Sequence, residues 1–254
     1  MPVHRRTFLQ LAAAGTSSAL LTTGQASTRQ PIKAVAFDGL TIIDPRPVFA
    51  LTEALFPGNG SELSNAWRTR QFEYTWLRSM GNRYADFWQI TEQALVFACK
   101  SLKLELSNQN RDRLMQRYLE LKAWPDVRAA LVSLKDAGVR SVILANLTVP
   151  MLDAVVRNSG LENFFEPHLS TDLVKAFKPD PRAYQMGLDG LQLKREEIVF
   201  SASASWDAAG AKWFGYTTFW INRMGLPVEE LSVMPDGIGT GQADLVNFVK
   251  SKLA

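Results

Sequence analysis

Residues 32–38 have the sequence IKAVAFD, a short apolar run that ends in a carboxylate. Such a run is typical of a buried strand, and it places Asp38 at the carboxyl end of that strand. After residue 125, short apolar runs alternate with helical patterns that end at glycines such as Gly138, Gly160 and Gly215. This alternation favours a parallel sheet with helices on both faces. We therefore predict an α/β fold with a doubly wound parallel sheet.

Residues 48–121 differ from the rest because their pattern is helical throughout, with turn signals near residues 56–60 and 106–108. Since this stretch interrupts the sheet after its first strand, we expect an inserted all-helical cap. The predicted domains are a core of residues 27–46 and 125–254 and a cap of residues 47–124.

The first 26 residues have the pattern of an export signal. Arg5 and Arg6 precede Phe-Leu and an apolar run at 11–21, and small residues follow at Gly24 and Ala26. Paired arginines in this setting are typical of a twin-arginine signal. We expect cleavage after Ala26, a periplasmic protein and no stable membrane anchor. The alternative is an uncleaved amphipathic helix or anchor, although the apolar run is short for a bilayer.

Composition excludes several classes of site. A formal net charge of +3 over 254 residues is too small to indicate a nucleic-acid-binding surface, so we expect no nucleic-acid partner. The single cysteine, Cys99, excludes an intramolecular disulfide and a multi-cysteine zinc site. With only His4 and His168, a His-rich metal cluster is impossible and a Ser-His-Asp triad is disfavoured.

Four segments place polar residues where strands of the predicted sheet end: Asp38, Asn146, the loop to Lys178, and the turn at 201–207 with Asp207. In an open parallel sheet, ligands bind outside the carboxyl ends of the strands. We therefore expect these four segments to meet in one crevice.

Together with the helical insertion, these residues resemble the haloacid dehalogenase superfamily, and within it the L-2-haloacid dehalogenases. The resemblance covers roughly residues 32–250 and rests on the order and spacing of several short strings. They are WR at 67–68, EYTWLR at 73–78, NRY at 82–84, KPD at 178–180 with Arg182 and Tyr184, WDA at 206–208 with Gly210, and WINR at 220–223.

The resemblance implies four catalytic residues. Asp38 would be a carboxylate nucleophile that forms an ester intermediate, where the alternative is a helix or turn cap. Arg68 would receive the departing halide and the substrate, although a lone helix arginine is more often a surface residue. Lys178 would hold Asp38 ionised and orient it. Asp207, with Lys178, would activate the water that attacks the ester.

Five further residues are predicted to bind substrate or halide. Thr41 is the hydroxyl of the Asp38 loop, Asn146 offers an amide N–H, and Tyr184 can join the network around Lys178. Phe87 and Trp206 would line an apolar pocket that desolvates the nucleophile. The alternatives are a turn residue for Asn146 and plain core packing for the two aromatic residues.

The residue at position 40 indicates whether the site is expected to bind a metal ion. Phosphatases of the superfamily place a second Asp two residues after the nucleophile, as general acid and magnesium neighbour, and this chain has Leu40 there. Halide leaves without protonation, and two lone carboxylates, Asp38 and Asp207, hold Mg²⁺ poorly. We therefore predict a site without metal or cofactor and disfavour a phosphatase.

Three alanines depart from the dehalogenase pattern. Ala145 replaces a usual Ser, and Ala202 and Ala204 replace a Ser and an Asn. The loop DGLT at 38–41 is also one residue short. A one-residue bulge would bring a neighbouring serine, Ser201, Ser203 or Ser205, into the site, and Thr148 could substitute for the hydroxyl missing at Ala145.

The sequence therefore predicts a hydrolase that converts short (S)-2-haloacids to (R)-2-hydroxyacids through an Asp38 ester. Its partners would be the haloacid and the halide, and the resemblance implies a homodimer formed through cap helices. The three alanines leave open a second hypothesis, a non-catalytic or weakly active protein that binds small carboxylates.

Overall fold

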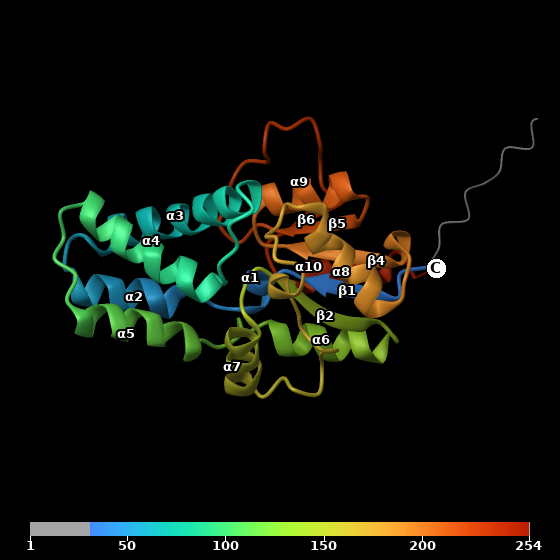
Figure 1. The fold of residues 1–254 in the computed structure, drawn as a ribbon. Helices are drawn as coiled ribbons and strands as arrows, with labels where there is room; N and C mark the ends of the chain where they lie inside the picture. Colours follow the sequence, from blue (N-terminus) through green and yellow to red (C-terminus); the bar gives the residue numbers. More distant parts are fainter. Residues whose placement is uncertain (1–30, 254) are drawn as a thin grey trace, which may run out of the picture.

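The computed structural model describes residues 31–253, in which a six-stranded parallel sheet lies beside a group of four helices (Figure 1). The strand order is β3-β2-β1-β4-β5-β6, and every neighbouring pair is parallel. The strands are β1 (Ala34–Phe37), β2 (Arg140–Ala145), β3 (Leu169–Ser170), β4 (Ile198–Ala202), β5 (Thr217–Ile221) and β6 (Gly237–Gly239). The predicted doubly wound α/β fold is confirmed.

The central strand β1 is buried on both faces because its residues alternate between two hydrophobic cores. Val35 and Phe37 pack into one core, whereas Ala34 and Ala36 pack into the other. The first core includes residues of α6 (Val127–Asp136), α7 (Val149–Ser159) and α10 (Gln242–Lys250), and the second includes residues of α8 (Pro181–Leu191) and α9 (Ser205–Phe214). Helices therefore cover both faces of the sheet.

Four helices are inserted between β1 and β2 and extend to one side of the sheet (Figure 1). They are α2 (Arg46–Leu55), α3 (Gly60–Met80), α4 (Phe87–Ser101) and α5 (Asn108–Leu119). We call this group the cap. The turn between α3 and α4 was not among the predicted turns; it begins at Gly81, and Asn82 adopts a positive φ of 52°. The exact domain boundaries, residues 46–47 and 124–125, stay predictions.

The sequence pattern did not indicate two short elements. Helix α1 (Gly39–Ile42) is a single turn directly after Asp38. Strand β6 contains two glycines and has no β-rich composition. Close packing requires both glycines, because a Cβ at Gly237 would lie 2.7 Å from the Phe219 and Phe248 rings and a Cβ at Gly239 would lie 2.8 Å from the Phe219 ring.

The predicted export signal, residues 1–26, lies outside the described residues. Among residues 31–253, no helix has both the length and the apolar character that a membrane span requires.

Candidate active site

Asp38 lies where the strand order reverses, between β1 and β4, which is the position at which open α/β sheets bind ligands. Its backbone N–H donates to the Ser201 carbonyl at 2.8 Å. Its side chain also caps α1, since Oδ2 accepts the Leu40 N–H at 3.2 Å. The shortened loop closes as one helical turn in which the Thr41 hydroxyl donates to the Asp38 carbonyl at 2.7 Å.

Lys178 lies between two carboxylates. Its Nζ donates to Asp38 Oδ1 at 2.7 Å and to Asp207 Oδ2 at 2.5 Å, and the residue is 1% exposed. Burial alone lowers the pKa of Lys178, but the charges of Asp207 and Asp38 raise it above its usual value. Lys178 is therefore a buried ammonium that holds the two carboxylates together.

Asp207 is fully buried, and this burial perturbs its pKa. Burial and the nearby charge of Asp38 raise the pKa of Asp207 to about 6, against the opposing effects of Lys178 and Tyr184. The Tyr184 hydroxyl donates to Asp207 Oδ1 at 2.7 Å. A carboxylate with a pKa near the working pH is suited to general base chemistry.

Ser203 is a site residue that was expected to reach the site only through a bulge in the strand. Its Oγ donates to Asp38 Oδ2 at 2.5 Å. Strand β4 pairs with β5 in regular register as far as Ala202, so no bulge is needed. Ala145 and Ala202 are buried in the hydrophobic cores, and Ala204 lies at the cavity described next. The alternating serines and alanines of residues 201–205 were the available signal.

A cavity of about 80 Å³ lies between the cap and the carboxyl ends of the strands. A single water requires roughly 10–15 Å³ by the same measure, so the space suits a molecule of several non-hydrogen atoms. Thr41 and Tyr184 are not among the residues that line this cavity, because their hydroxyls donate to the Asp38 carbonyl and to Asp207. The predicted residues that line it are Asp38, Arg68, Phe87, Asn146, Lys178, Trp206 and Asp207.

The cap contributes Arg68 and aromatic side chains to the cavity. Within residues 31–253, the half-buried Arg68 side chain makes no hydrogen bond or ion pair, so its charge is available to an anion in the cavity. Trp206, from the core, packs edge-to-face on Phe72 and Trp76 of the cap, with ring centroids 5.3 and 5.5 Å apart. Core and cap therefore meet at the cavity wall.

Asn146 joins the end of β2 to Lys178. Its Oδ1 accepts the backbone N–H of Lys178 at 3.0 Å. The carbonyl side of the amide is therefore used internally, which leaves the amide N–H₂ for a ligand in the cavity.

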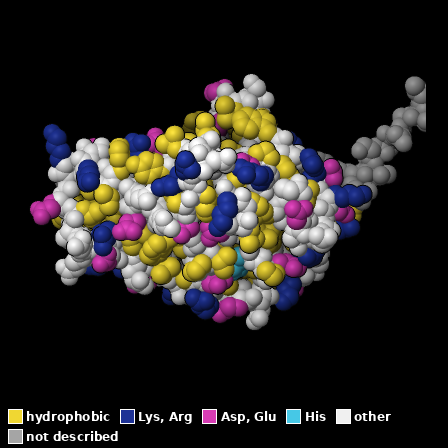
Figure 2. Space-filling view, viewed as in Figure 1, with side chains coloured by type: hydrophobic (Ala, Val, Ile, Leu, Met, Phe, Trp, Pro, Cys, Tyr) yellow, Lys and Arg dark blue, Asp and Glu magenta, His cyan; other side chains and the backbone are white. Residues whose placement is uncertain are grey.

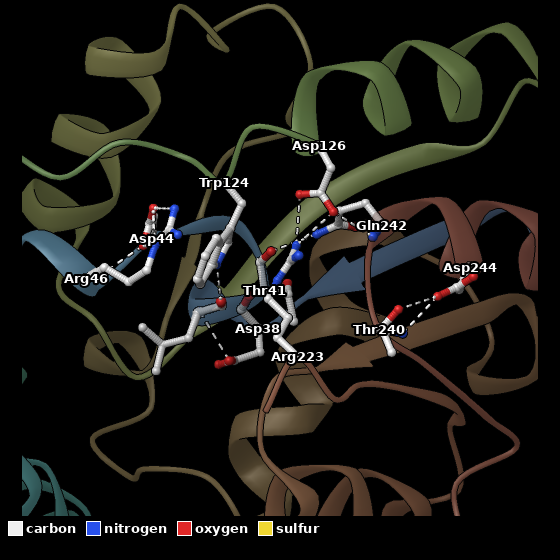
Figure 3. Close-up of polar contacts among 11 residues, drawn as sticks. Asp38, Thr41, Asp44, Arg46, Trp124, Asp126, Arg223, Thr240, Gln242 and Asp244 are labelled. Atoms are coloured by element: carbon white, nitrogen blue, oxygen red, sulfur yellow. Dashed lines mark hydrogen bonds and ion pairs between the residues drawn. The ribbon is translucent and has the colours of Figure 1, made fainter. Parts of the chain in front are cut away.

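The turn after Asp38 is held by residues outside the predicted site (Figure 3). Gln242 Nε2 donates to the Thr41 carbonyl at 2.7 Å, and Trp124 Nε1 donates to the Leu40 carbonyl at 3.3 Å. The Arg223 guanidinium lies 4.5 Å from the centroid of the Trp124 ring. Of these residues, only Arg223 belonged to a motif of the resemblance, and no local pattern marks the other two.

The chain is similar to known proteins over most of its length. The model of the haloacid dehalogenase-like hydrolases matches residues 5–215. The chain belongs to this family. It is 44% identical over 206 residues to an (S)-2-haloacid dehalogenase of Pseudomonas sp. (strain YL), which covers 81% of this chain and 89% of that protein.

Two solved structures show the similarity in three dimensions. The L-2-haloacid dehalogenase RSc1362 is 40% identical, with a TM-score of 0.85 over 87% of this chain and 100% of that chain. An L-2-haloacid dehalogenase from Xanthobacter autotrophicus with chloropropionic acid covalently bound is 32% identical, with a TM-score of 0.80 over 86% of this chain and 98% of that chain.

The donor set of this haloacid dehalogenase-like site does not fit a divalent metal. Leu40 supplies no side-chain oxygen, and the Asp38 and Asp207 carboxylates already share the Lys178 ammonium. Residues 31–253 contain no group of three His, Cys, Asp or Glu side chains that could hold a metal ion. Mg²⁺ requires near-octahedral oxygen coordination, which these side chains do not provide.

Proposed function

We propose that this protein hydrolyses the carbon–halogen bond of short (S)-2-haloacids and releases (R)-2-hydroxyacids. The observation that carries the proposal is the Asp38 carboxylate, held by Lys178 and Ser203 at the wall of a small cavity that Arg68 also lines. The activity for which the relatives are named supports the same reaction.

In the first step, an Asp38 oxygen attacks C2 of the haloacid from the side opposite the halogen. The C2–oxygen bond forms while the carbon–halogen bond breaks, the halide leaves with the bonding electrons, and C2 is inverted. Arg68 and the Asn146 amide N–H₂ offer positive partners to the halide and the substrate carboxylate. The apolar walls at Phe87 and Trp206 reduce hydration of the nucleophile.

In the second step, water attacks the carboxyl carbon of the Asp38 ester. Asp207 takes a proton from this water, and the acyl carbon–oxygen bond breaks to release the 2-hydroxyacid, which receives the proton. The water oxygen remains in Asp38. Lys178, within hydrogen-bond distance of both carboxylates, stabilises negative charge as it develops on the ester.

The test is a single turnover in oxygen-18 water with enzyme in excess of (S)-2-chloropropionate. Mass spectrometry should find the label in the peptide that contains Asp38 and none in the first product molecule. The (R) enantiomer should release no halide, and folded Asp38→Asn should release at least about 10³-fold less. Label that appears directly in the first product, with Asp38 unlabelled, would contradict the ester mechanism.

We also propose that residues 1–26 direct export to the periplasm by the twin-arginine route. The paired Arg5 and Arg6 and the apolar run that follows support this proposal. Fusion of residues 1–26 to a reporter that functions only after export as a folded protein tests it. Export should be lost when both arginines are replaced by lysine; export that persists without a functional twin-arginine translocase argues against this route.

A homodimer formed through cap helices is a further proposal. Leu77 and Met80 of α3 are 60% and 86% exposed, and their spacing places them on the same helix face as Tyr74, which packs on Phe97. Figure 2 shows apolar side chains among charged ones on the surface of the cap. Light scattering should give twice the chain mass for the native protein and the monomer mass for Leu77→Glu. A native monomer at micromolar concentration would exclude the proposal.

A further inference from the structure

Residues 171–178, which follow β3, place Lys178 in the active site; we call them the lysine segment. The segment begins with the 3-10 turn η1 (Thr171–Leu173) and ends at Lys178. The core holds its end, because the backbone N–H of Lys178 donates to Asn146 Oδ1 at 3.0 Å. The position of this backbone decides whether Lys178 Nζ reaches both carboxylates.

The cap holds the preceding backbone N–H. Phe177 N donates to Ser79 Oγ, near the end of α3, at 2.9 Å. Phe177 is 0% exposed, so loss of the Ser79 hydroxyl would leave a buried donor without this partner. Two consecutive N–H groups are therefore bound by different parts of the molecule, one by the cap and the next by the core.

Tyr84, in the turn between α3 and α4, adds a second connection from the cap. Its ring stacks on Phe177 with centroids 5.0 Å apart and planes at 22°. Its hydroxyl donates to the Asp172 carboxylate, and the Lys175 ammonium lies 4.9 Å from the ring centroid. Burial and the Asp172 charge raise the pKa of Tyr84, so the hydroxyl keeps its proton and remains a donor. Tyr84 thus contacts the lysine segment at three positions.

We propose that Ser79 and Tyr84 are positioning residues through which the docked cap places Lys178 between Asp38 and Asp207. The cap helices that enclose the cavity are then the same helices that complete the charge network beneath it. Burial of the substrate beneath the cap and correct placement of the ammonium are therefore coupled. The catalytic consequence rests on the proposed dehalogenase function, whereas the structural coupling does not.

The kinetic test uses Ser79→Ala and Tyr84→Phe, each of which removes one hydroxyl. Both should lower kcat by roughly 10-fold or more, as expected for loss of a buried hydrogen bond that orients a charged group, with a smaller effect on KM. Because Lys178 opposes the rise in the pKa of Asp207, a displaced Lys178 should move the acid limb of the kcat profile to higher pH. Ser79→Thr keeps the hydroxyl and should restore both the rate and the profile.

Ser107→Ala is the matched control. The Ser107 hydroxyl caps α5 by accepting the Asn110 N–H at 3.1 Å, and it belongs to the cap without touching the lysine segment. This variant should lower Tm and leave the pH profile unchanged. If Ser79→Ala and Tyr84→Phe likewise lower Tm only, their role is structural and the proposal is overturned.

Hydrogen–deuterium exchange separates this proposal from the dehalogenase function, because it needs no turnover. Amides of residues 171–178 should exchange faster in Ser79→Ala than in the native protein, and at the native rate in Ser107→Ala. If the native protein releases no halide, the proposed function is refuted. The exchange rates of amides 171–178 still test whether the cap is coupled to the lysine segment. Unchanged exchange in Ser79→Ala would overturn the coupling even if the native enzyme is active.

Discussion

The Asp207 carboxylate shows how single side chains set the chemistry of this site. Burial and the charge of Asp38 raise its pKa, whereas the Lys178 ammonium and the Tyr184 hydroxyl lower it. Esterification of Asp38 removes one negative charge, so the pKa of Asp207 should fall below about 6 in the intermediate. The proposed base is thus ionised at neutral pH when the water must be activated.

Tyr184→Phe tests this balance. The hydrogen bond from Tyr184 favours the ionised form of Asp207, so its loss should raise the pKa of Asp207 and move the acid limb of kcat to higher pH. The measurement is kcat from pH 4 to 9 at saturating substrate. Tyr216→Phe is the control, since the Tyr216 hydroxyl donates to the Tyr184 backbone carbonyl at 2.7 Å and not to Asp207. An unmoved acid limb in Tyr184→Phe would show that this hydrogen bond does not tune the base.

Ser203→Ala tests whether the hydroxyl that donates to Asp38 contributes to the reaction. Loss of a hydrogen bond to a carboxylate costs about 1.5–3 kcal/mol, so the rate of halide release should fall by roughly 10- to 100-fold. Ser205→Ala is the control. The Ser205 hydroxyl belongs to the same turn, but it accepts the Glu229 N–H and does not donate to Asp38. Equal effects of the two substitutions would mean that the turn, rather than the Ser203 contact, matters.

At the scale of elements, α8 and α9 approach closely so that Tyr184 on α8 can reach Asp207 on α9. A glycine makes this approach possible. A Cβ at Gly210 would lie 2.6 Å from the Tyr184 hydroxyl oxygen and 2.8 Å from Pro179 Cβ. The same contact would disturb the Lys178–Pro179 segment that carries the ammonium.

We therefore expect Gly210→Ala to destabilise the protein by about 1–3 kcal/mol, as overpacking does in a close-packed core. Urea unfolding followed by circular dichroism measures this change. The same variant should lose activity beyond what the unfolded fraction explains, because Tyr184 must move away from Asp207. Native stability in this variant would show that α8 and α9 can separate without cost.

At the scale of the whole molecule, two neighbouring linkers join cap and core. Ile43 and Ala123 form an antiparallel bridge, and the Asp44 N–H donates to the Lys122 carbonyl at 2.9 Å. Beyond them, Arg223 from the end of the sheet donates to both oxygens of Asp126 at 2.8 and 3.0 Å. The Arg223–Asp126 contact therefore connects the linkers between core and cap with the strand ends where the site lies.

Arg223→Ala should loosen this connection. It removes the contacts with Asp126 and Trp124, both partly exposed, so the expected loss of stability is about 1 kcal/mol. Amides of residues 120–126 should exchange faster with solvent. Arg46, whose guanidinium lies 4.7 Å from the centroid of the Trp124 ring, provides the control. Arg46→Ala leaves the Arg223–Asp126 pair intact and should have a smaller effect on these amides. The reverse order of effects would contradict the role given to Arg223.

The sequence by itself determined the fold class, the inserted cap and the segments that form the site. Apolar strand runs, helical periodicity and the residues that end helices or form turns are all local properties of the sequence. Asp38, Asn146, Lys178 and Asp207 were found because each follows a recognisable strand or a family motif. The tertiary structure alone decided that Ser203 donates to Asp38 and that Thr41 donates to the Asp38 carbonyl rather than lining the cavity. It also decided that Ser79 and Tyr84 hold the lysine segment. These contacts join residues far apart in the chain, such as Ser203 with Asp38, and their distances follow from how sheet, helices and cap pack together, which no local pattern encodes.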